Sequence, residues 1–374
     1  MSDEGYEEQY VKEAFDTNWI APLGKNVDEF EKEFCEVVNT KSGVALNSGT
    51  AAIHLALKAA GVKKNDKVFC STFTFAATAN PIIYEGAIPV FIESDKETWN
   101  MCPKTLEEAF IKFPDVKVVV LVHLYGLSAN IDEILKICKK YNAILIEDAA
   151  ESLGTIYKGK QTGTFGEFGI FSFNGNKIIT TSGGGILISN NHHKIEKARF
   201  WATQSRDQAV HYEHSEIGYN YRLSNISAGI GRGQLKVLNK RINRKKEIYH
   251  LYVSHLSKMN EISFMPDNPW DNPNYWLSCI ILNDEKLAKH VMKVLSFNNI
   301  ESRPLWKPMH IQPIFEKYEY MGDNLSIDLF NRGICLPSDT KLTNLELKKI
   351  SNLIIEAIST YSSKKSSEDL LEMK

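Results

Sequence analysis

A lone lysine stands in a stretch of small and polar residues. Lys177 lies between two strand-like runs, Gly169–Phe173 and Gly185–Ser189, and the glycines Gly183 and Gly184 follow it closely. Glycine lets the backbone approach a ligand. A lysine held away from bulk water can lose its proton and attack a carbonyl carbon, which forms a Schiff base. Lys177 is therefore a candidate nucleophile, although a solvated loop lysine fits the same pattern.

Two adjacent carboxylates, Glu147 and Asp148, close a buried apolar run at Ala143–Ile146. A carboxylate at the end of a strand can keep a heterocyclic nitrogen protonated. Opposite charges about 3 Å apart attract by roughly 5 kcal/mol at an effective dielectric of about 20, before desolvation costs. Asp148 is therefore a candidate partner for a cationic ring. A helix N-cap or a surface ion pair explains the same residue equally well.

The segment Asn47–Thr50 leads from a short strand-like run, Gly43–Leu46, into a helical run, Ala51–Ala60. Backbone N–H groups at the start of a helix, together with the positive end of its dipole, can cradle a phosphate. Ordinary N-capping by the Ser-Gly-Thr sequence is the alternative.

Aromatic residues Phe73 and Phe75 follow the strand-like run Lys67–Ser71, where a ring can stack on a planar ligand or pack in the core. The lysine, the carboxylate, the cradle and the aromatic ring together fit one cofactor. That cofactor is pyridoxal 5'-phosphate (PLP), a flat phosphorylated pyridine aldehyde that bonds to a lysine.

Alternating strand-like and helix-like runs position these residues. The strand-like runs also include Ile88–Ile92 and Val116–His123, and the helix-like runs include Ala76–Tyr84, Leu106–Lys112 and Ile131–Tyr141. This alternation predicts an α/β fold with a largely parallel sheet. Ligands bind at the carboxyl ends of the strands in such sheets.

The pattern changes after about Ser224, where a long helical run covers Ile226–His255. We expect a large domain at residues 1–240, a smaller C-terminal α/β domain at residues 241–361, and a frayed polar tail at residues 362–374. Near the other end of the chain, Asn26 is the expected N-cap of a helix that carries Val27 and Phe30 on its apolar face.

Composition excludes several classes of protein. The chain has 374 residues, a net charge of −2 and 43% hydrophobic residues, which is ordinary for a globular protein and leaves no general attraction to nucleic acid or membrane. No apolar run reaches the length of a membrane span. Met1–Tyr10 carries four acidic residues and no signal-peptide pattern. Six scattered cysteines without a C-x-x-C pair predict a reduced, cytoplasmic protein without a metal site.

Three motifs in chain order resemble the DegT/DnrJ/EryC1/StrS family of sugar aminotransferases, over about Ala14–Tyr361. The motifs are Glu-Asp-Ala-Ala-Glu at 147–151, Ser-Phe-x-x-x-Lys-x-x-Thr-Thr-x-x-Gly-Gly at 172–185, and Gly-Tyr-Asn-Tyr-Arg-Leu-Ser at 218–224. The resemblance implies the fold-type I PLP architecture. Relatives usually begin several residues earlier, so Met1 is expected inside the first helix.

The resemblance also implies roles for individual residues. Lys177 is the Schiff-base lysine and proton shuttle, Asp148 pairs with the pyridine nitrogen, and Glu151 lies near the phenolic oxygen of the ring. Phe75 stacks on that ring. The phosphate is held by Gly49, Thr50, Ser172 and, from the neighbouring subunit, Asn220, which implies a homodimer with shared active sites.

The reaction implied by the resemblance has two halves, in which L-glutamate gives its amine to PLP and the pyridoxamine phosphate then aminates a keto-sugar. The stretches 18–24, 123–126 and 300–310 are most similar to bacillosamine-type enzymes that use UDP-2-acetamido-2,6-dideoxy-4-ketohexose. The substrate residues expected from this likeness are Asn18, Pro22, Arg303 and His310, with structural capping as the alternative for Arg303 and His310. A 3-keto or dTDP-linked sugar is the close alternative, and a non-catalytic PLP-binding regulator or scaffold is the remote one.

Overall fold

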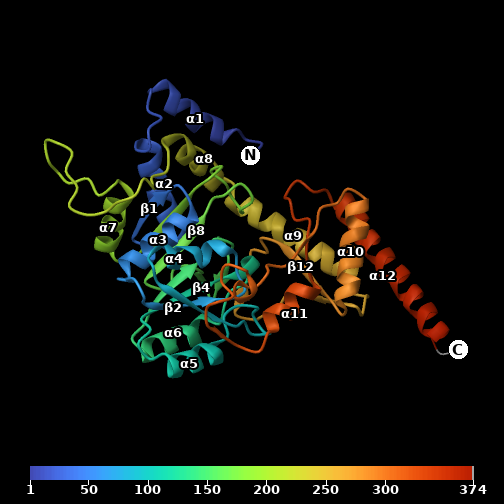
Figure 1. Cartoon of the computed structure of the whole chain (residues 1–374). Coiled ribbons are helices and arrows are strands. Elements are labelled where there is room, and N and C mark those ends of the chain that lie inside the picture. Colours follow the sequence, from blue (N-terminus) through green and yellow to red (C-terminus); the bar gives the residue numbers. More distant parts are fainter. Residues whose placement is uncertain (373–374) are drawn as a thin grey trace.

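A mixed eight-stranded sheet forms the centre of the computed structural model, which describes residues 1–372 and side chains as far as Ser363 (Figure 1). Strand β9 pairs antiparallel with both of its neighbours, and the other pairings are parallel. The expected largely parallel sheet is therefore confirmed. Its strands in spatial order are β1 (Ser42–Leu46), β9 (Gly185–Ser189), β8 (Phe168–Ser172), β5 (Ile144–Asp148), β4 (Val118–Val122), β2 (Lys67–Ser71), β3 (Ile88–Ile92) and β14 (Tyr320–Met321).

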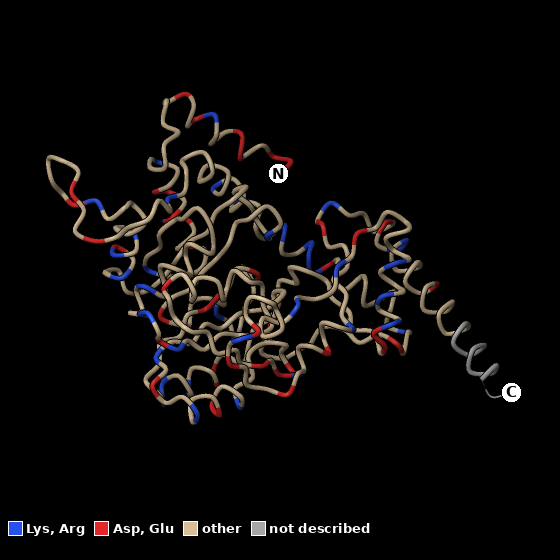
Figure 2. Tube along the Cα trace, viewed as in Figure 1, with Lys and Arg blue, Asp and Glu red and all other residues tan. Residues whose placement is uncertain are grey.

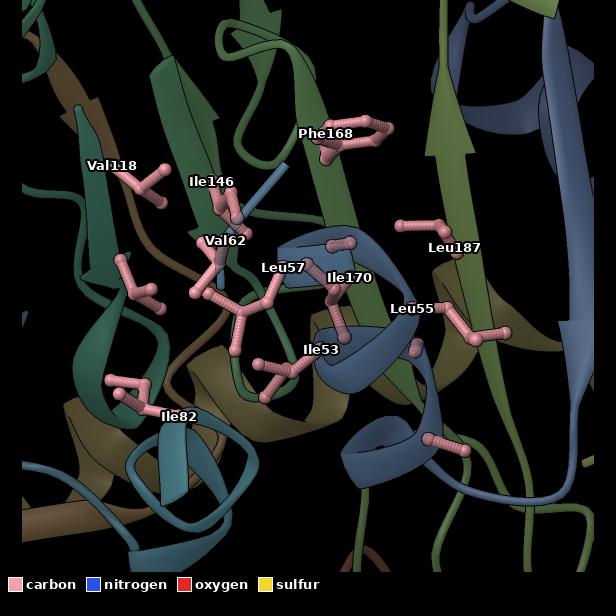
Figure 3. Close-up of a cluster of buried hydrophobic side chains, with 14 of the residues drawn as sticks. Ile53, Leu55, Leu57, Val62, Ile82, Val118, Ile146, Phe168, Ile170 and Leu187 are labelled. Carbon is pink, nitrogen blue, oxygen red and sulfur yellow. The ribbon is translucent and has the colours of Figure 1, made fainter. Parts of the chain in front are cut away.

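Helices cover both faces of this sheet, because successive side chains of a strand point to opposite sides. In β4, Val120 packs with one cluster and Val119 with another. The first face, shown in Figure 3, is covered by α3 (Gly49–Ala59), α4 (Asn80–Tyr84) and α7 (His192–Ala202). The second face is covered by α2 (Lys25–Val38), α5 (Pro103–Lys112), α6 (Ile131–Lys140) and α8 (Asn225–Lys236). The result is a three-layer α/β domain.

Three sequence expectations about helices are wrong. Helix α2 begins at Lys25 with Gly24 as its N-cap, and Asn26 lies inside it and donates to the Tyr10 carbonyl. Met1 lies outside the first helix, because α1 runs from Tyr6 to Asp16. The long helix predicted over 226–255 is divided at Val237 into α8 and α9 (Leu238–Leu256).

A smaller antiparallel sheet follows in the C-terminal part of the chain. Its strands are β10 (Ile262–Phe264), β12 (Ser278–Leu282), β15 (Gly333–Leu336) and β13 (Arg303–Pro304). Helices α9, α10 (Glu285–Phe297) and α12 (Asn344–Glu372) pack on one face of it, and α11 (Leu325–Arg332) lies beside it. The segment after Tyr361, which was expected to fray, continues α12 as far as Glu372. The expected smaller α/β domain is present, although β14 crosses back to the large sheet.

The remaining elements are short and line the junction between the two sheets. Strands β6 (Ile156–Tyr157), β7 (Lys160–Gln161) and β11 (Asp271–Asn272) form a third sheet, and the 3-10 turns are η1 (Ala76–Thr78), η2 (Leu124–Gly126) and η3 (Met309–Ile311). Asn274 ties the junction together by donating its amide to the carbonyls of Glu151 and Leu153 at 3.0 and 2.9 Å. Gly126, at φ +93°, leaves no room for a side chain, since a Cβ would lie 1.9 Å from Asn274 Oδ1.

Lysine and arginine alternate with aspartate and glutamate along the trace, as Figure 2 shows, in keeping with the net charge of −2. Within residues 1–372, no helix has the length and apolar character needed to cross a membrane. All six cysteines are free thiols.

Candidate active site

Lys177 lies in the turn that connects β8 and β9, and its side chain is only 12% exposed. The ammonium nitrogen is 3.6 Å from Glu151 Oε1 and 4.0 Å from the centre of the Trp276 ring. A carboxylate and an aromatic face therefore lie on two sides of this amine. The solvated-loop alternative therefore fails, because this lysine is enclosed at the junction between the domains.

Asp148 ends strand β5, as expected, and is buried. Its Oδ2 accepts a hydrogen bond from Thr78 Oγ1 at 2.7 Å, and its Oδ1 accepts one from the Ala150 amide at 3.1 Å. No lysine or arginine among the described side chains forms an ion pair with it. A buried carboxylate with only neutral donors has a place for a cation, which fits a protonated pyridine nitrogen.

Glu151 is buried between the two domains. Its Oε2 accepts from the Tyr125 amide at 2.8 Å, and its Oε1 accepts from Trp306 Nε1 at 3.3 Å. Burial raises the pKa of this carboxyl above its usual value, and the nearby charge of Lys177 opposes that shift. Glu151 and Lys177 thus form one buried pair of a carboxyl group and an amine, placed to exchange a proton with a bound ligand.

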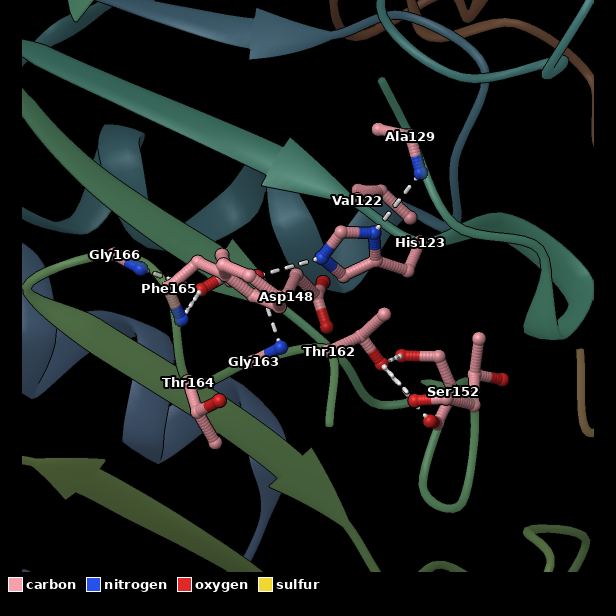
Figure 4. A network of polar contacts seen from close by, with 12 residues as sticks. Val122, His123, Ala129, Asp148, Ser152, Thr162, Gly163, Thr164, Phe165 and Gly166 are labelled. Carbon is pink, nitrogen blue, oxygen red and sulfur yellow. Dashed lines mark hydrogen bonds and ion pairs between the residues drawn. The ribbon is translucent and has the colours of Figure 1, made fainter. Parts of the chain in front are cut away.

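Glu147, the residue next to Asp148, belongs to a different network, whose members His123 and Gly163 are labelled in Figure 4. Burial alone would raise its pKa, but hydrogen bonds from His123 and from backbone amides outweigh burial and hold the pKa below its usual value. His123 Nε2 lies 2.9 Å from Oε2, while His123 Nδ1 accepts from the Ala129 amide. The amides of Gly163, Phe165 and Gly166 complete the set at 2.9, 2.6 and 2.6 Å. Glu147 therefore holds loop 162–166 in place.

The predicted phosphate cradle is assembled at the start of α3. Ser48 caps the helix by accepting from the Ala51 amide at 3.1 Å, and the amides of Gly49 and Thr50, the first two residues of α3, have no partner within the helix. A Cβ on Gly49 would lie 3.1 Å from Ser172 Cβ, which brings Gly49, Thr50 and Ser172 together. Free amides and a hydroxyl at a helix N-terminus fit a phosphate group.

Asn220 is exposed, and its carbonyl accepts from Asn47 Nδ2 at 3.2 Å, directly before the cradle. Phe75 is 52% exposed, and its ring centre lies 5.2 Å from that of Trp306. The core alternative for Phe75 is therefore excluded, and its face is available to a planar ring. Phe73, in contrast, is buried in the core.

A cavity of about 1070 Å³ opens beside these residues, between the two domains. Its lining includes Phe75, Trp276, Trp306, Lys307 and Asn176, the residue before Lys177, while Lys177 itself is not part of the lining. This volume is at the upper end of the range of about 300–1,000 Å³ that is usual for small-molecule sites. It accommodates a ligand considerably larger than an amino acid.

The four expected substrate residues lie in different surroundings. Arg303 lines the cavity, is exposed and forms an ion pair with Glu301 at 2.6 Å. His310 lies outside the lining, where Nδ1 is 2.6 Å from Thr72 Oγ1 and the ring stacks on Tyr320 at 3.7 Å. Burial lowers the pKa of His310 to about 4, so it is neutral at pH 7.

Asn18 and Pro22 lie in the turn between α1 and α2, and neither lines the cavity within one chain. Asn18 has a positive φ of 54°. Next to it, Trp19 is 48% exposed and donates Nε1 to the Leu23 carbonyl at 2.6 Å. Contact of this turn with a substrate therefore remains a prediction.

The sequence patterns missed Trp276, Trp306 and Tyr125. Trp306 joins Tyr125 through its backbone N–H, which donates to the tyrosine Oη at 2.7 Å, and joins Glu151 through its indole N–H. The available signals were Trp276, which follows the polar stretch Pro266–Asn274 by two residues, and Trp306, which lies between Pro304 and Pro308. Neither signal shows which distant residue each ring would contact.

Known proteins resemble this chain over nearly its whole length. The model of the DegT/DnrJ/EryC1/StrS aminotransferase family matches residues 2–355. EpsN of Bacillus subtilis, named as a pyridoxal phosphate-dependent aminotransferase, is 51% identical over 96% of this chain and 95% of its own. A GDP-perosamine synthase of Vibrio cholerae is 36% identical, with 94% and 96% of the two chains covered.

A UDP-4-amino-4,6-dideoxy-N-acetyl-beta-L-altrosamine transaminase of Campylobacter jejuni is 37% identical over 73% of this chain and 69% of its own. Among solved structures, a DegT DnrJ EryC1 StrS aminotransferase from Brucella abortus superimposes with a TM-score of 0.88 at 26% identity, and it covers 94% of this chain and 95% of its own. The expected PLP aminotransferase fold is thus confirmed.

Proposed function

Because the chain belongs to the DegT/DnrJ/EryC1/StrS aminotransferase family, whose members use PLP, we propose that it moves the amino group of L-glutamate to C4 of a nucleotide-linked 4-keto-6-deoxy sugar. UDP-2-acetamido-2,6-dideoxy-4-ketohexose is the proposed acceptor. The observation that carries the proposal is Lys177, 3.6 Å from Glu151 and adjoining a cavity of about 1070 Å³. The six free thiols fit a reducing cytoplasm as its location.

The residues of the site fit PLP. The first amides of α3 and the Ser172 hydroxyl hold its phosphate, Asp148 keeps its ring nitrogen protonated, and the exposed face of Phe75 packs on its ring. When bound, PLP supplies a carbonyl group that takes up nitrogen and an electron-poor ring that stabilises negative charge on the adjacent carbon.

Lys177 moves the proton in this proposal. Its amine is withdrawn from water and lies between a carboxylate and an aromatic face, where it can take a proton from the substrate carbon that carries the nitrogen and deliver it to the cofactor carbon on the other side of that nitrogen. Glu151 accepts hydrogen bonds from Tyr125 and Trp306 and so keeps a fixed position beside that amine.

The identity of the sugar nucleotide rests on the cavity wall and on the relatives. Arg303 and Lys307 place cationic side chains that can contact a diphosphate on a wall that also carries Glu301, the ion-pair partner of Arg303. The Campylobacter jejuni relative is named for a UDP-linked sugar, while the Vibrio cholerae relative is named for a GDP-linked one. A GDP-linked 4-keto sugar is accordingly the second candidate.

The test is a screen of UDP-, GDP- and dTDP-linked 4-keto and 3-keto sugars with L-glutamate and the PLP-loaded protein, read by the formation of 2-oxoglutarate and of the amino sugar. We expect the UDP-linked 4-keto sugar to give the highest kcat/KM. Turnover of a 3-keto sugar alone would overturn the 4-keto assignment. A protein that stays colourless after incubation with PLP and turns over none of the sugars would overturn the enzyme proposal in favour of a regulator or scaffold.

We further propose a homodimer whose active sites share residues. Between α7 and α8 the chain forms an extended loop that projects from the domain (Figure 1), and Val210, Tyr212 and Ile217 on it are exposed. Exposed apolar side chains on one segment support an interface with a second copy. Asn220, at the base of the loop, is the residue proposed to reach the neighbouring cradle.

Mixing two inactive variants tests the shared site, namely Lys177→Ala and Asn220→Asp. If each site needs Lys177 from one subunit and Asn220 from the other, co-expressed variants regain part of the activity, because some sites receive both intact residues. Absence of any regain, or an active monomer in sedimentation, would refute the shared site.

A further inference from the structure

Two cysteines face each other across the smaller antiparallel sheet. Cys279 in β12 and Cys335 in β15 are register partners, and their Sγ atoms are 3.7 Å apart. Opposed residues of antiparallel strands have Cα atoms about 4.5–5.5 Å apart. A disulfide bridges Cα separations of about 4.4–6.8 Å. The bond can therefore form by rotation of side chains, without a new pairing of the strands.

The two thiols differ in their access to solvent. Alternation along the strands turns Ile280 and Ile334 toward α9, α10 and α12, and turns the two cysteines toward the junction between the domains. Cys335 lines the large cavity and is partly exposed, whereas Cys279 is fully buried behind it. Burial also raises the pKa of the Cys279 thiol. A small oxidant in the cavity thus meets Cys335 first, with a second thiol already in reach.

The pair is connected to the reactive groups by direct contacts. Cys335 pairs with Arg303 of β13 on its other side, and two residues after β13 comes Trp306. Trp306 donates to Tyr125 Oη and to Glu151, which adjoins Lys177. Moving Cys335 Sγ toward Cys279, from 3.7 Å to about 2.05 Å, therefore changes the cavity wall beside β13, the strand that leads to Trp306.

We propose that Cys279 and Cys335 are an oxidation site that forms a reversible disulfide with a hydroperoxide and thereby lowers turnover. With hydrogen peroxide, Cys335 Sγ attacks one oxygen, the O–O bond breaks, and a sulfenic acid and one water form. Cys279 Sγ then attacks the Cys335 sulfur, the S–O bond breaks, and the hydroxide leaves with the Cys279 proton as a second water. Two thiols lose two electrons and two protons to the peroxide, and a dithiol reductant reverses the change.

The experiment treats the PLP-loaded protein with hydrogen peroxide, blocks the remaining thiols and identifies peptides by mass spectrometry without reduction. We expect a peptide cross-linked between Cys279 and Cys335, with turnover lowered by about threefold or more and recovered with dithiothreitol. The cross-link needs no sugar substrate, so its failure and a failure of the proposed aminotransferase activity are distinguishable. With no turnover measurable, PLP absorbance reports whether the site is disturbed.

A variant that removes only the buried partner separates the two steps. Cys279→Ala keeps its basal activity, cannot cross-link, and accumulates a sulfenic acid on Cys335 that dimedone traps. Cys102→Ser, which changes another partly exposed thiol, retains the cross-link. Absence of the cross-linked peptide in the wild-type protein overturns the site, and a cross-link that leaves both turnover and PLP absorbance unchanged overturns its effect on the reaction.

Discussion

Glu147 and Asp148 are neighbours in one strand, yet they belong to two different regions. Glu147 lies in a closed network in which His123 and three backbone amides satisfy both carboxylate oxygens. Asp148 lies at the open junction, with neutral donors and no described cation beside it. Alternation of side chains along β5 separates the two, so that one carboxylate holds a loop and the other, the proposed partner of a ligand, keeps room for a further donor.

Burial alone therefore does not identify the carboxylate that binds a ligand. Both carboxylates are buried, and the completeness of the donor set distinguishes them. A carboxylate with all its lone pairs occupied contributes to stability, because its partners would otherwise be unsatisfied. A carboxylate with unoccupied lone pairs, such as Asp148, can accept a further hydrogen bond from a ligand.

Lys177→Ala gives the largest expected effect on the junction side. Without the amine that moves the proton, turnover falls by about 10⁴-fold or more, while the unfolding midpoint changes little. Steady-state kinetics and thermal unfolding measure the two quantities, with Lys286→Ala on exposed α10 as the matched control. Retained turnover in Lys177→Ala would assign the carrier role to another lysine.

Glu147→Gln gives the largest expected effect on the network side. Each oxygen of Glu147 accepts two hydrogen bonds, and an amide offers only one acceptor oxygen, so two buried donors lose their partner. The free energy of unfolding should fall by about 3 kcal/mol, with kcat of the folded fraction nearly unchanged. Exposed Glu316→Gln is the control, measured by urea unfolding.

The pH dependence of Glu147→Gln sharpens this prediction. The folded state lowers the pKa of Glu147, so its stabilising contribution is present above the unfolded value of about 4.3 and is lost as pH falls through the folded pKa. The stability difference between wild type and variant should therefore shrink in acid. A difference that stays constant down to pH 3 would contradict the role assigned to the ionised form.

Asp148→Asn should show the reverse of Glu147→Gln, with a large loss of turnover and little loss of stability. Asparagine can keep the contacts with Thr78 and Ala150 but loses the charge that holds a ring nitrogen protonated, so turnover should drop by about 100-fold, with little change in stability. PLP titration and kinetics measure the effect, and exposed Asp115→Asn serves as the control. Strong destabilisation with normal turnover would instead assign Asp148 a structural role like that of Glu147.

Glu151→Gln should have a smaller effect on stability than Glu147→Gln, and with the opposite sign. The folded state raises the pKa of Glu151, so the protonated form is favoured, and stability is lost as pH rises from the unfolded value through the folded pKa. Removing the ionisable group should stabilise the cofactor-free protein by roughly 1 kcal/mol above pH 6 while slowing turnover. Urea unfolding at pH 5 and pH 8 would contradict this if the variant were less stable at both.

Much of the large domain was predictable from local patterns. The runs Lys67–Ser71, Ile88–Ile92 and Gly185–Ser189 form strands with the predicted bounds, because each is a short apolar segment bounded by polar or turn residues. The motifs also placed Asp148 at a strand end and Lys177 in a turn, as the structure has them. Helix 226–255 was misjudged because the break at Val237 keeps the apolar spacing on both sides.

The wall of the cavity was not predictable in this way. Trp306 contacts Glu151 across more than a third of the chain, through short strands that have little pattern of their own. Glu147 and Asp148 are adjacent in the sequence and look alike there. Only the hydrogen bonds from the loop at 162–166 to Glu147 reveal that its role differs. Such contacts depend on tertiary packing, which a single sequence does not display.

Strand β14 has a consequence for how the protein is made. Tyr320 of β14 pairs with Phe91 of β3 at the edge of the large sheet. Strand β3 therefore stays unpaired on this side until β14 has been synthesised. At roughly 5–20 residues per second, the roughly 230 intervening residues take about 10–45 s to translate. Throughout that time Val90, Phe91 and Ile92 lie next to an unpaired edge, where nascent chains on one messenger can associate. The edge of β3 therefore needs protection from association until Met321 emerges.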